Sequence, residues 1–409
     1  MKKFFALLLS LAMVLALVAC GQKETTTPDD TQTPDDTTPE VEYKIAMITD
    51  YGDITDQSFN QTTYEACKAF AEDNSIEFSY FKPAGDNTAD RVAMIEKAVD
   101  EGFNVIVMPG YAFGGAIVEA APEFPDVKFI ALDVAAGDLL ETAVAKAGEA
   151  YDYTPENWDL NKYVDMSNVY CAVYQEELCG YMAGYAAVKL GYKNLGFLGG
   201  MSVPAVVRYG YGFVQGVDAA AADLGLTDVK LNYIYGGQFF GDADITAVMD
   251  TWYQGGTEVV FACGGGIYTS AVDAAKKANA KVIGVDVDQA GVIAKYAGVD
   301  GMTVTSAMKG LYPATYDTLT DVIVNGNWDK YVGKIATLGL VSGTDPEANY
   351  VQIPMGDGTQ WSDSFTQDDY KAMVKDMFDG KITVSNDTTK APTDFATVIT
   401  VDDQGSIKG

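Results

Sequence analysis

The stretch "KIAMIT" at residues 44–49 runs directly into "DYGDITDQSFN" at residues 50–60, and together they predict one strand–loop–helix unit. The first stretch is continuously apolar, as expected for a parallel strand covered on both faces. The second contains the start of a capping box, in which Ser58 and Gln61 would open a helix over about 58–73. A strand that leads directly into a helix is the repeating unit of α/β proteins.

The same unit recurs along the chain. Further short apolar runs lie at residues 76–81, 104–108, 128–132, 194–199, 230–235, 258–263, 281–286 and 302–307. Helical periodicity lies between them, for example over 245–252. The pattern predicts right-handed βαβ units in two sets, one over 44–132 and one over 194–286. We therefore expect an α/β protein with two doubly wound parallel-sheet lobes, and we expect the long polar stretch at 137–168 to be an insertion.

The first 42 residues are expected to direct export of the protein and to tether it to the membrane. Two lysines, an apolar run and "LVAC" predict a signal peptide over 1–20, and this ending resembles the bacterial lipobox, which leaves Cys20 as a lipidated N-terminus. An ordinary cleaved signal is the alternative. Residues 21–42 are polar, contain two "TPDD" units and are expected to form a disordered tether. We expect an extracytoplasmic protein that is lipid-anchored to the cell membrane.

The composition excludes several classes of function. The formal net charge of −31 argues against nucleic acid as a partner, because its phosphates would be repelled. The chain has no histidine, which removes Ser-His-Asp and Cys-His nucleophiles and the commonest zinc ligand. We expect no cofactor and no metal. Cys67, Cys171, Cys179 and Cys263 are scattered over predicted helices and strands, so we expect small buried side chains more than disulfides.

Three interpretations are open for the aspartates of the segment 50–60. Asp50, Asp53 and Asp56 could hold a metal, but their spacing is not that of an EF-hand. Nucleoside hydrolases, which this opening loosely resembles, have paired adjacent aspartates that are absent here. Asp56 could simply favour the start of the helix. Asp50 and Phe59, finally, could face the crevice at the carboxyl ends of the strands, where doubly wound proteins bind ligands.

A family resemblance favours the third interpretation. "DYGDITDQSFNQTTYEA" (50–66), "PDVKFIALD" (125–133), "KVIGVDVDQ" (281–289) and "VTSAMKG" (304–310) follow in the order found in the basic membrane lipoprotein family. Its purine-nucleoside-binding members are substrate-binding lipoproteins of ABC importers. The resemblance covers about residues 43–385 and implies a two-lobed fold of the type I periplasmic-binding class. It leaves the insertion at 137–167 unmatched.

The resemblance also implies a binding site. Its residues are Asp50, Ser58, Phe59, Asn60, Asp133, Phe239, Gly265, Asp286 and Lys309. Phe59 and Phe239 would stack on the two faces of a purine, with Phe240 as a possible substitute for Phe239. Asp286 would accept hydrogen bonds from the ribose hydroxyls, and Lys309 would keep the neighbouring carboxylates ionised.

The expected domain boundaries follow the same resemblance. Lobe 1 would comprise 43–172 and 303–327, and lobe 2 would comprise 173–302 and 328–385. The chain would cross between the lobes near 168–175, 300–306 and 325–332, and these crossings would act as hinges. The C-terminal tail over 386–409 has no counterpart in the resemblance.

The expected function is binding without catalysis. A monomer would close around a purine nucleoside such as guanosine, inosine or adenosine, and an ABC permease in the membrane would recognise the closed form. Three alternatives remain open: a sugar or another small polar ligand, calcium-dependent hydrolysis of nucleosides, and transfer of the closed form to a receptor instead of a permease.

Overall fold

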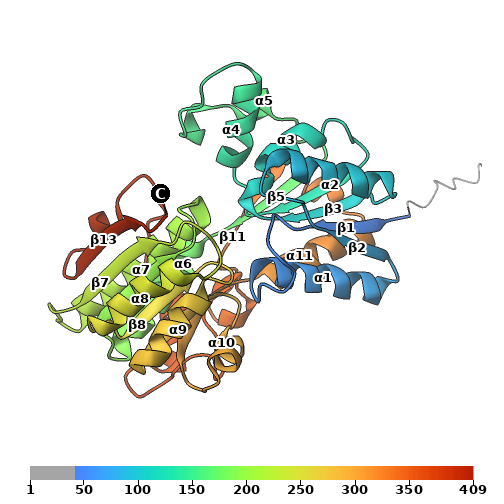
Figure 1. Cartoon of the computed structure of the whole chain (residues 1–409). Coiled ribbons are helices and arrows are strands. Elements are labelled where there is room, and N and C mark those ends of the chain that lie inside the picture. Colours follow the sequence, from blue (N-terminus) through green and yellow to red (C-terminus); the bar gives the residue numbers. More distant parts are fainter. Residues whose placement is uncertain (1–41, 409) are drawn as a thin grey trace, which may run out of the picture. The chain divides into compact units, whose positions relative to one another are not determined.

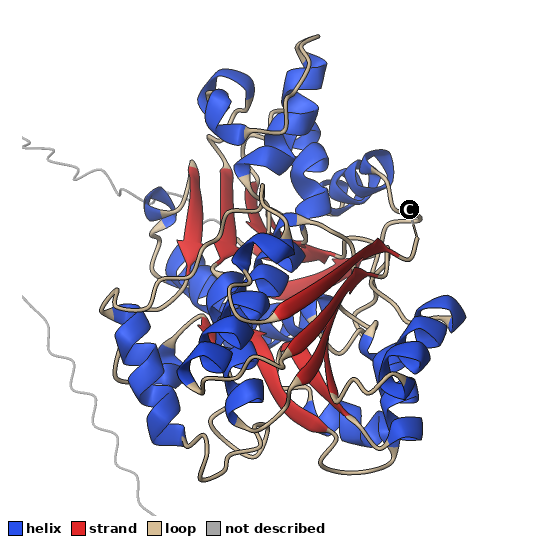
Figure 2. Cartoon of the chain, turned by 90° about the vertical axis from the view of Figure 1, so that its left-hand side faces the viewer, coloured by secondary structure: helices blue, strands red, loops and turns tan. Residues whose placement is uncertain are grey.

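The computed structural model describes residues 42–408, which form two lobes built on parallel sheets with helices on both faces (Figures 1 and 2). The predicted signal peptide over 1–20, the lipidation site at Cys20 and all but the last residue of the tether over 21–42 lie outside the described residues. No helix within the described range is long and apolar enough to cross a membrane.

The sheet of lobe 1 has the strand order β11-β5-β4-β3-β1-β2, and the pairs within it are parallel. Its strands are β1 (Lys44–Ile48), β2 (Glu77–Phe81), β3 (Val105–Pro109), β4 (Lys128–Leu132), β5 (Val169–Tyr174) and β11 (Lys334–Leu338). Both faces of this sheet are covered. Val105 and Val107 pack into one core cluster, while Ile106 and Met108 pack into another on the opposite face. This double burial explains why the strands are continuously apolar.

The sheet of lobe 2 has the order β12-β10-β9-β8-β6-β7-β13, and only β12 runs antiparallel to its neighbour within the described chain. Its strands are β6 (Asn194–Gly199), β7 (Lys230–Tyr235), β8 (Val259–Cys263), β9 (Lys281–Asp286), β10 (Thr303–Lys309), β12 (Val351–Gln352) and β13 (Thr400–Ser406). All five residues of β8 are buried.

The helices connect and cover these strands. They are α1 (Phe59–Asn74), α2 (Thr88–Asp100), α3 (Gly114–Ala120), α4 (Ala136–Lys146), α5 (Leu160–Tyr163), α6 (Glu176–Lys189), α7 (Pro204–Asp223), α8 (Ala243–Gln254), α9 (Tyr268–Ala278), α10 (Ala290–Ala297), α11 (Leu311–Leu319) and α12 (Gln367–Phe378). The unmatched segment at 137–167 falls on α4 and α5, which project from lobe 1 (Figure 1). Cys67, Cys171, Cys179 and Cys263 are buried and free, as expected.

Two of the three predicted crossings between the lobes are displaced. β10 pairs with β9 in the second sheet, so residues 303–309 belong to lobe 2 and the chain crosses after Lys309. α11 then packs against α1, and β11 pairs with β5, so residues 328–338 belong to lobe 1. The next crossing follows β11. The first crossing, after β5, lies within the predicted range of 168–175. The tail is part of lobe 2, because β13 pairs with β7.

Candidate ligand-binding site

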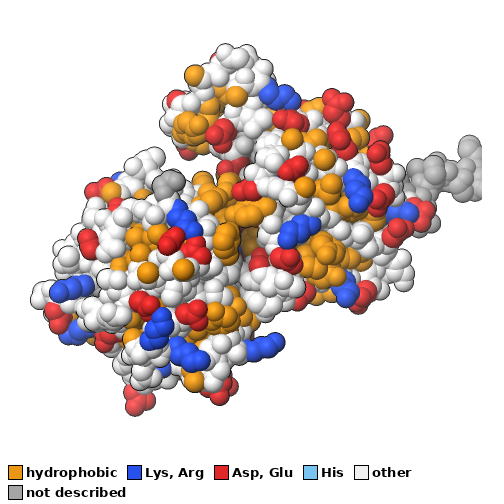
Figure 3. Space-filling model, in the orientation of Figure 1, with side chains coloured by type: hydrophobic (Ala, Val, Ile, Leu, Met, Phe, Trp, Pro, Cys, Tyr) orange, Lys and Arg blue, Asp and Glu red, His pale blue; other side chains and the backbone are white. Residues whose placement is uncertain are grey.

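A cavity of about 430 Å³ lies between the two lobes, at the carboxyl ends of both sets of strands. Figure 3 shows the hollow there, edged by apolar side chains. Its size falls in the usual range of small-molecule sites. The predicted residues that line it are Asp50, Phe59, Asn60, Asp133, Phe239, Gly265, Asp286 and Lys309. Ser58, the remaining predicted residue, does not line the cavity.

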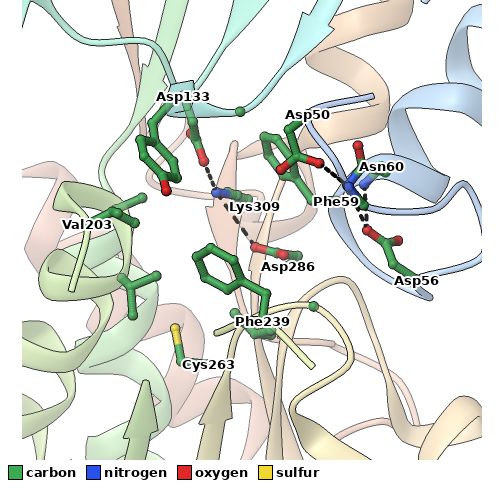
Figure 4. Close-up of a pocket in the computed structure, with 18 of the residues that line it drawn as sticks. Asp50, Asp56, Phe59, Asn60, Asp133, Val203, Phe239, Cys263, Asp286 and Lys309 are labelled. Carbon is green, nitrogen blue, oxygen red and sulfur yellow. Dashed lines mark hydrogen bonds and ion pairs between the residues drawn. The ribbon is translucent and has the colours of Figure 1, made fainter. Parts of the chain in front are cut away.

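An aromatic ring from each lobe faces this cavity (Figure 4). Phe59 lies in the first turn of α1 in lobe 1. Phe239 lies in the loop between β7 and α8 in lobe 2, where its ring packs on the backbone of Gly200 and Gly264. Gly264 has a φ of 146°, and a Cβ atom there would stand 2.7 Å from the Phe239 ring. The neighbouring Phe240 also lines the cavity but is 56% exposed, whereas the Phe239 ring is the one packed against these glycines.

The first acidic group belongs to the loop after β1. Asp50 Oδ1 accepts hydrogen bonds from the amides of Tyr51 and Gly52, both at 2.7 Å, and from the Asn60 amide group at 3.2 Å. Burial raises the pKa of Asp50, and these three donors oppose that shift. Asn60 Oδ1 is buried and has no hydrogen-bond partner within residues 42–408. Buried acceptors are usually hydrogen-bonded, so Asn60 Oδ1 is an unsatisfied acceptor in a residue that lines the cavity.

The start of α1 differs from the predicted capping box. Ser58 makes no side-chain cap, and Asp56 takes that role by accepting from the amides of Ser58 and Asn60, both at 2.9 Å. The Ser58 hydroxyl instead donates to Asp286 Oδ2 at 2.5 Å, across the two lobes. Ser58 is thus placed to orient a carboxylate of the site. Its predicted role in direct ligand contact has no counterpart in the lining of the cavity.

Lys309 is at the centre of the cavity's charges (Figure 4). Its ammonium forms an ion pair with Asp133 of lobe 1 and lies 3.7 Å from Asp286 Oδ1 and 3.6 Å from Glu176 Oε1. It also lies 4.6 Å from the centre of the Phe59 ring. Burial alone would lower the pKa of Lys309, but the carboxylates outweigh burial and raise it. The lysine is therefore charged at every physiological pH.

The carboxylates around Lys309 are held in unusual geometry. Asp133 and Asp286 stand at strand ends with φ angles of 59° and 65°, in the left-handed region that most side chains avoid. Backbone strain of this kind gathers at functional sites. Asp133 Oδ1 is buried and has no hydrogen-bond partner in the described part of the chain. Like Asn60 Oδ1, it is an unsatisfied acceptor in a residue that lines the cavity.

Sequence reasoning missed Arg208, which also lines the cavity. Its Nε donates to Glu176 Oε2 at 2.7 Å, and the carboxylates around it raise the pKa of Arg208 despite its burial. A signal was present in the composition, since Arg91 and Arg208 are the only arginines of the whole sequence. Arg91 lies behind the same site, where its Nε donates to the Asp50 carbonyl oxygen at 3.1 Å.

Asp138, at the start of α4, is a further acidic group of the cavity lining. Burial raises the pKa of Asp138 to about 7. A carboxyl group whose pKa is raised in the folded state does not destabilise the fold while it is protonated, at a pH below its ordinary pKa. As the pH rises through 7, the buried group must lose its proton, and the folded state is destabilised. We therefore expect Asp138→Asn to unfold like the wild type near pH 4 and to be more stable by at least about 1 kcal/mol at pH 8, since one pKa unit corresponds to about 1.4 kcal/mol.

Urea unfolding at several pH values measures this difference. Asparagine can still accept the hydrogen bond that Ala135 N donates to Asp138 Oδ2 at 2.7 Å, so the helix start is preserved. Asp363→Asn, at an exposed carboxylate, is the matched control and should show no such trend. Equal stability of Asp138→Asn and the wild type at both pH values would contradict the expectation.

Two lobes with parallel sheets and a cavity at the strand ends define a fold class, the type I periplasmic-binding fold. The structure agrees in fold with a solute-binding protein of an ABC transporter from Aeropyrum pernix K1. The TM-score is 0.60 at 19% sequence identity, and the match covers 86% of this chain and 90% of that one. The chain belongs to the family described as ABC transporter substrate-binding protein PnrA-like, whose model matches residues 43–345.

Individual relatives agree with this assignment. The chain is 25% identical over 359 residues to the ABC transporter nucleoside-binding protein BmpA of Lactococcus lactis, a match that covers 84% of this chain and 90% of the relative. It is 26% identical over 311 residues to an uncharacterized lipoprotein of Pyrococcus abyssi, covering 73% and 67%. The protein is therefore a substrate-binding protein of an ABC transporter and not an enzyme. This overturns the hydrolase alternative.

Proposed function

We propose that the cleft binds purine nucleosides and that the protein delivers them to its ABC permease. The observation that carries the proposal is the pair of rings, Phe59 and Phe239, which line one cavity from different lobes. A flat, uncharged base offers two π-faces, and stacking on aromatic side chains contributes about 1–3 kcal/mol per base. The relative from Lactococcus lactis, which carries the word nucleoside in its name, supports the same ligand class.

The polar groups of the cavity suit the rest of such a ligand. Asp133 Oδ1 and Asn60 Oδ1 are acceptors without a hydrogen-bond partner within the described range, and both belong to residues that line the cavity. Base amino groups and ribose hydroxyls are donors that would satisfy them. Asp286, already held by Ser58, would accept from the ribose diol, and Lys309 would donate to the sugar or to a ring nitrogen.

The proposed mechanism is closure of the lobes around the ligand. A nucleoside that contacts both lobes stabilises the closed form, and the permease would recognise that form. A lipidated Cys20 and the segment 21–42 would keep the protein at the extracytoplasmic face of the cell membrane. The lipoprotein named in Pyrococcus abyssi supports this anchoring.

Mass spectrometry of the ligand that the purified protein releases on denaturation tests the proposal. We expect a purine nucleoside, and titration calorimetry of the emptied protein should give a dissociation constant of about 1 μM or below, equivalent to about −8 to −10 kcal/mol. Ribose alone is the matched control and should bind far more weakly, because it has no base to stack. Tight binding of ribose or another sugar, with no binding of inosine, guanosine or adenosine, would overturn the proposal.

A further inference from the structure

The C-terminal strand β13 runs along the edge of lobe 2 and ends beside the loop that carries Phe239 (Figure 1). It pairs in parallel with β7, from Thr400 opposite Lys230 to Ser406 opposite Tyr235. β7 leads directly into the loop 236–242. The last described residues of the chain therefore reach the ligand-facing end of the sheet. This region lies outside the residues 43–345 that the family model matches.

The beginning of this segment is firmly anchored. The buried carboxylate of Asp218, on α7, accepts hydrogen bonds from the amides of Thr397 and Val398, both at 2.8 Å, and from the Thr397 hydroxyl at 2.6 Å. Farther along, Gln404 accepts from the indole of Trp252 at 3.1 Å. These contacts fix the path of an otherwise exposed edge strand.

The end of the segment turns onto the loop. The register shifts between Asp403 and Ser406, where Gly405 has a φ of 71°, and such irregularities redirect a strand. The amide of Ile407 then donates to the Tyr235 carbonyl oxygen at 2.8 Å. Lys408 crosses the loop so closely that a Cβ atom on Gly237 would stand 2.7 Å from the Cβ atom of Lys408.

Lys408 joins both sides of the loop around Phe239. Its ammonium donates to Gln238 Oε1 at 3.0 Å and pairs with Asp242, the N-cap residue of α8. The Gln238 amide group in turn donates to the Phe240 carbonyl oxygen at 2.9 Å and to Asp242 Oδ2 at 2.9 Å. Phe239 therefore lies between two residues that this hydrogen-bond network holds.

We propose that residues 397–408 form a strap that holds the loop 236–242, and that Lys408 is the residue through which the strap positions Phe239 for the ligand. The second half of this inference rests on the proposed function, because it takes Phe239 as a ligand contact. The first half concerns the loop alone. Lys408 does not line the cavity and would act through Phe239, so its role is positioning.

Hydrogen–deuterium exchange of the ligand-free protein tests the first half. Lys408→Ala should raise amide exchange in the loop 236–242 by about two- to fivefold, the range expected from loss of a partly exposed ion pair. Lys408→Arg should restore most of the protection, because it keeps the charge. Lys381→Ala, which removes an exposed ion pair with Asp376 at 2.6 Å, is the matched control and should leave the loop unchanged. Unchanged exchange in Lys408→Ala would overturn the strap.

Calorimetry with inosine tests the second half. Lys408→Ala should weaken binding by about two- to fivefold in the wild type and have no effect in a Phe239→Ala background, because the positioned ring is then absent. A general structural role would weaken both backgrounds equally, and that result would overturn positioning through Phe239. If the wild type binds no nucleoside at all, the proposed function fails, whereas the exchange experiment still decides whether the strap exists.

Discussion

Replacing Lys309 by methionine should lower the free energy of unfolding by about 3 kcal/mol at pH 8, the largest effect that we expect from one side chain. Lys309 is buried and donates a hydrogen bond to Asp133. In the variant, Asp286 would still accept hydrogen bonds from the hydroxyls of Ser58 and Tyr209. The variant therefore leaves the Asp133 carboxylate buried without its ion-pair partner, and breaking a buried pair in this way costs more than the intact pair contributes. Urea unfolding followed by tryptophan fluorescence measures the loss.

The pH dependence of this loss has a definite sign. Burial raises the pKa of Asp133, and removal of Lys309 takes away the positive charge that opposes this shift more strongly, the other being that of Arg208. A carboxyl group with a raised pKa in the folded state is tolerated when protonated, so the deficit of the variant should shrink as the pH falls from 8 to 5.

A second substitution distinguishes the stability that is lost through the unpaired buried charge from the stability that is lost through poorer packing. Lys309→Met combined with Asp133→Asn should recover about half of the lost stability, because no unpaired carboxylate is then buried. Lys381→Met, at an exposed lysine, should change stability by less than about 0.5 kcal/mol. A pH-independent loss that Asp133→Asn does not relieve would show that Lys309 matters for its packing and not for its charge.

Most strands were predictable because a strand buried on both faces gives a continuous run of apolar residues in the sequence. The run at 104–108 corresponds to β3 at Val105–Pro109, and each of the other predicted strands is likewise present within a residue or two. A strand that is covered on both faces consists mainly of apolar residues, which distinguishes it from a polar loop. The α/β class and the two lobes followed from these runs.

Four strands were missed. One is β5, whose run "VYCAVY" is almost entirely buried and was not recognised, and the others are the edge strands β11, β12 and β13. β11 is largely uncovered, and β13 reads "TVDDQGS", with six of its seven residues exposed. Edge strands are held mainly by backbone hydrogen bonds, which are available to almost any residue type. Because β11 was missed, residues 328–338 were placed in the wrong lobe. The pairing of β10 with β9 could not be predicted from the sequence either, because tertiary packing determines which strands pair.

Local sequence patterns predicted which residues line the cavity better than they predicted the hydrogen-bond partners of those residues. Phe59 and Phe239 face one cavity, as their motifs implied. Ser58 fits a capping box by spacing, yet its hydroxyl binds Asp286, which lies 228 positions along the chain. No local rule reports a contact at that separation. Arg208 was missed because a lone arginine in a helix usually lies at the surface, whereas this one pairs with the buried Glu176.

Phe59→Ala should weaken the binding of inosine by about 1–3 kcal/mol, and Phe239→Ala should have a similar effect. Each substitution removes one of the two phenylalanine rings proposed to stack on the base, both of which line the cavity. Phe59→Trp should keep most of the affinity, since it retains an aromatic face. Titration calorimetry with the emptied protein measures the change, and binding of ribose should not respond to either substitution.

Phe378→Ala is the matched control, because that ring is 49% exposed and does not line the cavity. It should leave inosine binding unchanged. Phe240→Ala tests which ring of the pair is used: its side chain is 56% exposed, so we expect a smaller loss than for Phe239→Ala. If Phe59→Ala and Phe239→Ala both bind inosine like the wild type, the base is not stacked between the lobes. The cavity would then recognise its ligand through the carboxylates and Lys309 alone, which is the behaviour expected for a sugar.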